Sequence, residues 1–274
     1  MTNYQIKIEY VGTNFVGWQF QKNGISIQEK IERALKKIFK TKTKIFGAGR
    51  TDKGVHANGQ YANFKVKNNI INTQKFLGTL NFYLNNDLIS VTDIKIKNLN
   101  FHSRFLAKER VYNYYIINRQ SLLSLDKNRA WHIKKKIDLN ILKKGGKLLE
   151  GTHDFSAFRS SSCTAKSPVR KINSVKVSKN GEKIKITFKS KSFLQNQVRS
   201  MVGCLVKLSC NDWTFKEFKS VLKSKKDQNA HLPPQLMVFF CLMLNINFYF
   251  FLTLHLEPSR IIYPIHLLEP HLQG

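Results

Sequence analysis

The chain has 274 residues, enough for one large domain or two smaller domains that each have a core. It carries 46 lysine and arginine residues against 17 aspartate and glutamate residues, so its net charge is +29. Such an excess favours nucleic acid or an anionic membrane as the partner, although a lysine-rich proteome would explain part of it. Aromatic residues make up 12% of the chain and provide rings on which bases can stack.

The first half of the sequence alternates between strand and helix patterns. Residues 4–10 place apolar and polar side chains in turn, which predicts a half-buried first strand instead of a secretion signal. Ser26 followed by Glu29 is a capping box and predicts the start of a helix. We expect Thr73 to cap a second helix that ends at Leu84. Further strands are predicted at residues 60–66, 89–96 and 111–118.

The second half repeats this order of elements. Asp138 is placed to cap a helix that ends at Leu149, and Asn180-Gly181 is a strong hairpin signal between strands at 169–179 and 182–189. Two amphipathic helices are predicted at 193–208 and 215–222. The pattern predicts an α+β fold of two similar lobes, with a mixed, largely antiparallel sheet flanked by helices. We expect an N-terminal lobe at 1–107 and a C-terminal lobe at 108–234.

Residues 235–274 form an atypical apolar tail that we expect to lie outside the rest of the fold. Residues 227–274 hold one basic and three acidic residues, unlike the basic remainder of the chain. Residues 236–254 are almost wholly apolar and just long enough for a membrane span, but Asn245 and Asn247 near the middle argue against one. A frame-shifted tail, a final strand within 239–250 and a membrane anchor remain the alternatives.

The cysteines indicate where the protein works. Cys163, Cys204, Cys210 and Cys241 form no Cys-x-x-Cys pair, which argues against a zinc site. Isolated cysteines are typical of reduced thiols, so we expect a cytoplasmic protein with no bound metal.

The most informative segment is the glycine-rich stretch at residues 47–57. It places one carboxylate, Asp52, between the cations Arg50 and Lys53. Nearby cations favour the ionised carboxylate, so we expect them to lower the pKa of Asp52 and leave a nucleophile or base. The alternative is that Asp52 closes an Asx-turn between two strands.

Four strings along the chain resemble the tRNA pseudouridine synthase A (TruA) family. They occur in the order of the family and are 48–57 (AGRTDKGVHA), 101–105 (FHSRF) with 110–114 (RVYNY), 151–159 (GTHDFSAFR) with 166–170 (KSPVR), and 193–203 (FLQNQVRSMVG). The resemblance implies the pseudouridine synthase fold. It also implies an isomerase that converts uridine to pseudouridine in the tRNA anticodon arm at positions 38, 39 and 40. It further implies a homodimer with basic clefts that uses no cofactor and no metal.

The resemblance also implies roles for four residues. Asp52 falls on the catalytic aspartate of the family, and Arg50 on the arginine just before it. Tyr112 falls on the tyrosine that packs against the target base, and Arg199 on the arginine that pairs with the catalytic carboxylate. Asp52 could attack C1′, add to C6 of the uracil or remove the 2′ proton, and the sequence leaves these three routes open.

Each of the supporting residues has a second interpretation that does not involve chemistry. Tyr112 could be a strand aromatic of the core, and Arg50 could be a phosphate clamp. Arg199 lies beside the apolar stripe of its helix, where a buried charge needs an anion such as Asp52, but it could also be solvated at the rim. We expect His56 to be a structural hydrogen-bonding residue.

The sequence departs from the family pattern at Lys53, where alanine is usual, and at Asn196 and Gln197, where many relatives have histidine and methionine. The largest departure begins at residue 231, where relatives close with a Pro-x-His-Gly-Leu-like turn. Two other functions therefore fit parts of the sequence: a non-catalytic RNA-binding relative, and a membrane-associated protein anchored by the apolar tail.

Overall fold

The computed structural model describes residues 1–224 and 240–243. Most of the apolar tail predicted at 235–274 therefore lies outside the described residues. Within the described part of the chain, every helix is too short or too polar to cross a membrane.

The first lobe contains two helices and four strands. Its elements in chain order are β1 (Thr2–Tyr10), α1 (Ile27–Phe39), β2 (Ile45–Gly47), β3 (His56–Val66), α2 (Thr73–Leu84) and β4 (Ile89–Lys97). The predicted start of α1 is confirmed, because the Ser26 side chain accepts a hydrogen bond of 3.1 Å from the Glu29 N–H. The Glu29 carboxylate, which a full capping box would turn back to the Ser26 N–H, pairs with Arg33 instead. The predicted cap of α2 is wrong by one residue. Asn72, whose side-chain oxygen accepts from the Lys75 N–H at 2.8 Å, precedes Thr73 and takes its place.

The second lobe contains three helices and five strands among the described residues. Its elements are β5 (Arg110–Asn118), β6 (Trp131–Ile133), α3 (Leu139–Leu148), β7 (Gly151–Asp154), β8 (Val169–Asn180), β9 (Lys183–Ser190), α4 (Gln197–Ser209) and α5 (Phe215–Lys223). The Asp138 carboxylate caps α3, and β8 and β9 form the predicted hairpin. The helix predicted to begin at residue 193 begins only at Gln197, because Asn196 turns the backbone with a φ of 60°.

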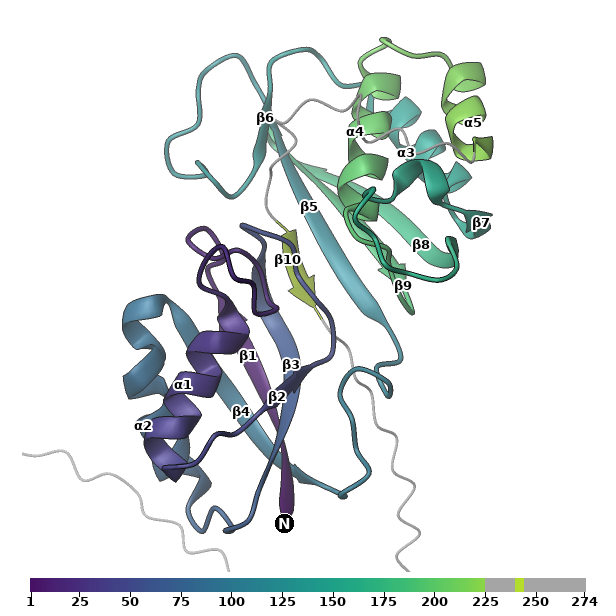
Figure 1. The fold of residues 1–274 in the computed structure, drawn as a ribbon. Helices are drawn as coiled ribbons and strands as arrows, with labels where there is room; N and C mark the ends of the chain where they lie inside the picture. The colour runs from purple at the N-terminus through teal and green to yellow at the C-terminus, as the bar shows by residue number, and fades with distance from the viewer. Residues whose placement is uncertain (225–239, 244–274) are drawn as a thin grey trace, which may run out of the picture.

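The strands form one mixed, largely antiparallel sheet, as predicted (Figure 1). Its order is β4-β1-β3-β10-β5-β9-β8-β7, where β10 (Phe240–Met243) lies between the strands of the two lobes. β10 pairs parallel to β3 and antiparallel to β5. The α1 and α2 helices lie beside the first half of the sheet and α3, α4 and α5 beside the second half (Figure 1).

Each half of the sheet has its own hydrophobic core. The first core gathers around Tyr4, Ile6 and Phe64 of the first lobe, and the second around Tyr114 and Phe188 of the second lobe. The Tyr112 side chain packs against both cores. β4 ends at Lys97 and β5 begins at Arg110, so the expected lobe boundary at residue 107 falls within the connection between them.

Candidate active site

The loop between β2 and β3, which carries Asp52, is held by hydrogen bonds to its own lobe. The Trp18 N–H donates to the Thr51 carbonyl at 3.0 Å, and the hydroxyls of Tyr10 and Thr51 lie 2.8 Å apart in a buried position. The Gly54 N–H, which an Asx-turn at Asp52 would use, donates to Phe15 instead. These bonds fix the backbone of the loop and leave the Asp52 carboxylate for a partner elsewhere.

That partner comes from the second lobe. The backbone N–H of Asn196, at the N-terminus of α4, donates a hydrogen bond to the Asp52 carboxylate, and the charge of Arg199 acts on it. The positive end of the helix dipole also favours an anion there. The structure thus brings the predicted aspartate and the predicted arginine together across the two lobes.

The expected pKa shift of Asp52 is wrong in sign. Burial raises the pKa of this carboxyl above its ordinary value, although Arg199 and the Asn196 N–H act in the opposite direction. Neither Arg50 nor Lys53 is among the causes of the shift, and the side chains of both are exposed, where water screens their charge. The cations beside Asp52 in the sequence predicted a lowered pKa, whereas burial of the carboxyl in the folded protein raises it.

Arg199 connects the second lobe to the loop directly. Its Nη2 donates a 2.8 Å hydrogen bond to the carbonyl oxygen of Lys53, the residue after Asp52. The side chain is half-buried on α4, between the buried residues Val198 and Ser200. Burial raises the pKa of the Tyr114 hydroxyl, and the charge of Arg199 acts to lower it.

Tyr112 lies on β5 next to this pair. Its ring meets the Phe193 ring edge to face, with centroids 5.0 Å apart and an interplanar angle of 81°. Burial raises the pKa of the Tyr112 hydroxyl, and the Asp52 charge raises it further. The ring is therefore both part of the packing between the cores and a neighbour of the carboxylate, which reconciles the two interpretations of this residue.

Arg50 is less closely connected with Asp52 than Tyr112 and Arg199 are. Its side chain is exposed, and its pKa is lowered by partial burial and by the charge of Arg104. The charge that acts on the pKa of Arg50 is thus that of another arginine and not that of Asp52. Such a cation suits contact with RNA phosphate or with the backbone of a displaced nucleotide.

Sequence reasoning missed Arg110, at the start of β5. Its guanidinium donates to the carbonyl of Ala48 in the loop, to the carbonyl of Arg104 at 3.1 Å and to the carbonyl of Lys191 after β9. It therefore joins three separate segments around the candidate site. Its position two residues before Tyr112, on the same face of the strand, was the signal that could have identified it.

His56 has the structural role expected of it. Its Nδ1 accepts a hydrogen bond from the Gly12 N–H at 3.3 Å, and its Nε2 lies 3.1 Å from the carbonyl oxygen of Asn128. Burial lowers the pKa of the imidazole, so the neutral ring with the proton on Nε2 fits both bonds.

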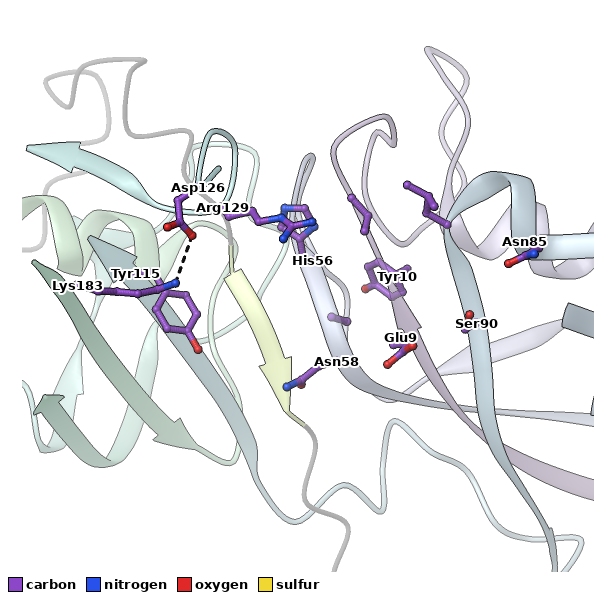
Figure 2. Close-up of a pocket in the computed structure, with 13 residues that line it drawn as sticks. Glu9, Tyr10, His56, Asn58, Asn85, Ser90, Tyr115, Asp126, Arg129 and Lys183 are labelled. Atoms are coloured by element: carbon purple, nitrogen blue, oxygen red, sulfur yellow. Dashed lines mark hydrogen bonds and ion pairs between the residues drawn. The ribbon is translucent and has the colours of Figure 1, made fainter. Parts of the chain in front are cut away.

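A cavity of about 580 Å³ lies elsewhere on the molecule (Figure 2). It is lined by His56, Tyr115 and an ion pair of 3.2 Å between Asp126 and Lys183. Tyr115 points to the face of β5 opposite that of Tyr112, because side chains alternate along a strand. None of the four predicted site residues lines this cavity, so it is separate from the candidate site.

Comparison with known proteins identifies the fold as that of pseudouridine synthases. The family model described as tRNA pseudouridine synthase matches residues 6–106 and 146–239. A protein of Pelagibacter ubique named tRNA pseudouridine synthase A is 53% identical over 226 residues, 82% of this chain and 92% of that protein. The protein of the same name from Ehrlichia chaffeensis is 40% identical, over 84% of this chain and 95% of that protein. The one from Maricaulis maris is 39% identical, over 81% of this chain and 89% of that protein. The chain belongs to the tRNA pseudouridine synthase family.

Proposed function

We propose that this protein isomerises uridine to pseudouridine in the anticodon arm of tRNA, at positions 38, 39 and 40, with Asp52 as its catalytic residue. The relatives, named tRNA pseudouridine synthase A, support the reaction and its substrate. The net charge of +29 suits a polyanionic substrate, because lysine and arginine contacts with phosphate provide most of the affinity for nucleic acid.

The observation that carries the assignment is the position of Asp52 between the lobes. Its carboxylate receives the Asn196 N–H and the charge of Arg199, while the backbone of its loop is held by the first lobe. Each route for the reaction begins with an ionised carboxylate that attacks carbon or removes a proton. Burial raises the pKa of Asp52, so its basicity is greater than that of a solvated aspartate.

The reaction itself explains the rest of the site. The N1–C1′ bond breaks, the uracil rotates and C5 joins C1′, so no atom is gained or lost apart from the proton that leaves C5 and the proton that N1 receives. The detached base must remain in place during this step, and Tyr112 provides a flat ring beside the carboxylate. The base must first leave its stem, and Arg50 at the exposed rim is placed to hold the displaced strand.

Replacement of Asp52 by asparagine tests the proposal. We expect Asp52→Asn to bind tRNA normally and to lose turnover by at least about 10²-fold, because the amide is neither nucleophile nor base. Tritium release from tRNA that carries 5-tritiated uridine measures turnover, and filter binding measures affinity. Asp93→Asn is the matched control, since Asp93 is the same residue type in a surface ion pair with Lys95.

Two results would contradict the proposal in different ways. Turnover of Asp52→Asn near that of the wild type would remove Asp52 from the chemistry. Wild-type protein that binds tRNA but releases no tritium would favour the non-catalytic RNA-binding relative. Thermal unfolding of each variant shows that a loss of turnover does not result from a loss of fold.

We also propose that the protein acts as a cytoplasmic homodimer with lobes at 1–107 and 108–234. The family resemblance of the four sequence strings supports the dimer, and the separate cores of the two halves support the lobe boundary. Sedimentation equilibrium at micromolar concentration tests the dimer, and a monomer mass throughout would contradict it.

A further inference from the structure

Three aromatic rings form an exposed cluster on the first lobe, close to the loop that carries Asp52. The Phe46 ring lies 5.1 Å from that of His102, which lies 4.4 Å from that of Phe105. The Phe46 side chain is 42% exposed and that of Phe105 72% exposed. We call these three residues the aromatic platform. Large exposed rings are costly in water, so their grouping here suggests that something binds them.

Positive charges surround the platform. The Arg104 guanidinium lies 6.0 Å from the centroid of the Phe105 ring. Partial burial and then the charges of Arg104 and Lys65 lower the pKa of His102, so its ring is neutral near pH 7 and able to stack. In residues 1–224, neither Arg104 nor Lys65 forms an ion pair with a carboxylate. The platform therefore combines flat rings with cations that are not neutralised by acids.

Buried polar groups hold the platform segment against the sheet. The Asn63 side-chain oxygen accepts from the Ser103 N–H at 2.9 Å, and Asn63 donates to Asn3 at 3.1 Å. Asn3 in turn donates to the Phe101 carbonyl at 2.9 Å. All four residues are almost fully buried. Because this network fixes the backbone on both sides of His102, the rings need little ordering when a ligand binds.

The platform is physically continuous with the candidate site. Phe46 belongs to β2, which leads directly into the Asp52 loop. Arg110 donates to the carbonyls of both Ala48 and Arg104, and so ties the loop to the platform segment. The Arg104 charge lowers the pKa of Arg50 at the rim of the site, after partial burial.

We propose that the aromatic platform stacks an unpaired base of the RNA substrate, while Arg104 and Lys65 contact the adjoining phosphates. This inference rests on the proposed function and extends it to a second point of contact outside the centre. Stacked rings bordered by cations suit nucleic acid, because every base offers a π-face and every linkage a negative charge. An apolar protein partner would not require the cations.

Leucine substitutions separate stacking from simple apolar contact. We expect Phe46→Leu with Phe105→Leu to weaken binding of an RNA stem–loop about tenfold, because leucine has no π-face. Binding of a fully paired duplex of equal length should not change, since it offers no unpaired base. At saturating RNA, tritium release should be unchanged, so the effect lies in KM. Phe105→Tyr keeps a ring and should bind like the wild type.

The α2 helix provides a matched control. Phe82 is 77% exposed beside Tyr83, and the Lys37 ammonium lies 4.9 Å from the Tyr83 ring centroid, so the chemistry is similar. These residues do not adjoin the loop, and Phe82→Leu should leave stem–loop affinity unchanged. Thermal unfolding of every variant provides the check on folding.

Three results would overturn the proposal that the platform stacks a base. They are a stem–loop affinity unchanged by the double substitution, an equal loss of affinity for stem–loop and duplex, or an equal loss of stem–loop affinity in Phe82→Leu. Each of these can occur while the wild type releases tritium normally, in which case the proposed function stands. An absence of tritium release by the wild type would contradict the proposed function, and the comparison of the two RNAs would still test stacking.

Discussion

The two lobes contribute to the candidate site in different ways. The first lobe supplies a loop whose backbone is fixed by Trp18 and Phe15, and whose charged side chains are mostly exposed. The second lobe supplies half-buried side chains on regular elements, Tyr112 on β5 and Arg199 on α4. The first lobe therefore holds most of the loop that carries the carboxylate, whereas the second lobe supplies Asn196 and Arg199, which act on its charge. The difference predicts that loss of a second-lobe group that acts on Asp52, such as Arg199, alters the pH dependence of turnover, and that other changes do not.

Apart from Asp52→Asn, Arg199→Gln is the variant that should lower turnover most. Burial raises the pKa of Asp52 and Arg199 lowers it, so removal of Arg199 leaves the raising effect less opposed. The pKa of Asp52 then rises further, and the ionised fraction of its carboxyl at a given pH falls. The acid limb of the pH profile, which is the range over which turnover falls as the pH is lowered, therefore moves to higher pH. We expect turnover near neutral pH to fall about 10²-fold, since the bond to Lys53 that positions the loop is also lost.

The pH profile of tritium release, measured at saturating tRNA, checks this expectation. Arg33→Gln is the matched control, because Arg33 is exposed on α1 and paired with Glu29 on the same helix. An acid limb that stays at the pH of the wild type would show that Arg199 does not control the charge of Asp52, whatever happens to the rate.

Arg110→Lys should have the next largest effect, because it loosens the connection between the lobes without removal of charge. One ammonium cannot reach the carbonyls of Ala48, Arg104 and Lys191 together, as the planar guanidinium does. We expect turnover to fall about tenfold and the free energy of unfolding to fall by about 2 kcal/mol. Tritium release and urea unfolding measure the two effects.

The acid limb distinguishes Arg110 from Arg199. Arg110 does not act on the charge of Asp52, so its replacement by lysine should leave the pH of the limb unchanged. A shift of the limb as large as that in Arg199→Gln would contradict the division of roles between position and charge.

Local patterns in the sequence predicted most of the fold. The alternation at residues 4–10, the caps at Ser26 and Asp138 and the Asn180-Gly181 hairpin depend on neighbours within a few residues, and each is confirmed. The predicted start of α4 was wrong because Asn196 turns the backbone through a positive φ, and no pattern in the neighbouring residues predicted this turn. It is this turn that directs the Asn196 N–H to Asp52.

The site residues were proposed from the sequence strings, but their electrostatics was not predictable from them. The pKa of Asp52 depends on burial in the folded protein and on Asn196 and Arg199, which lie more than 140 residues away along the chain, so its neighbours Arg50 and Lys53 gave the wrong direction. Arg110 was missed because its partners are three backbone carbonyls, which carry no residue signature. The tail predicted at 235–274 lies mostly outside the described residues, although Phe240–Met243 forms β10 between the lobes.

The smallest effect on turnover is expected at the far end of the second lobe. Thr214 caps α5, where its hydroxyl accepts from the Glu217 N–H at 3.3 Å and the Glu217 carboxylate accepts from the Thr214 N–H at 2.7 Å. Thr214→Ala removes one half of this capping box and should lower the free energy of unfolding by about 1 kcal/mol. Thr214→Ser keeps the hydroxyl and should be close to the wild type in urea unfolding. Because α5 packs against α4 and β7 but carries none of the groups that act on the charge of Asp52, the rate and the acid limb of tritium release should not change in either variant. If Thr214→Ala moved the acid limb, overall stability of the second lobe, and not the local contacts of α4, would control the charge of Asp52.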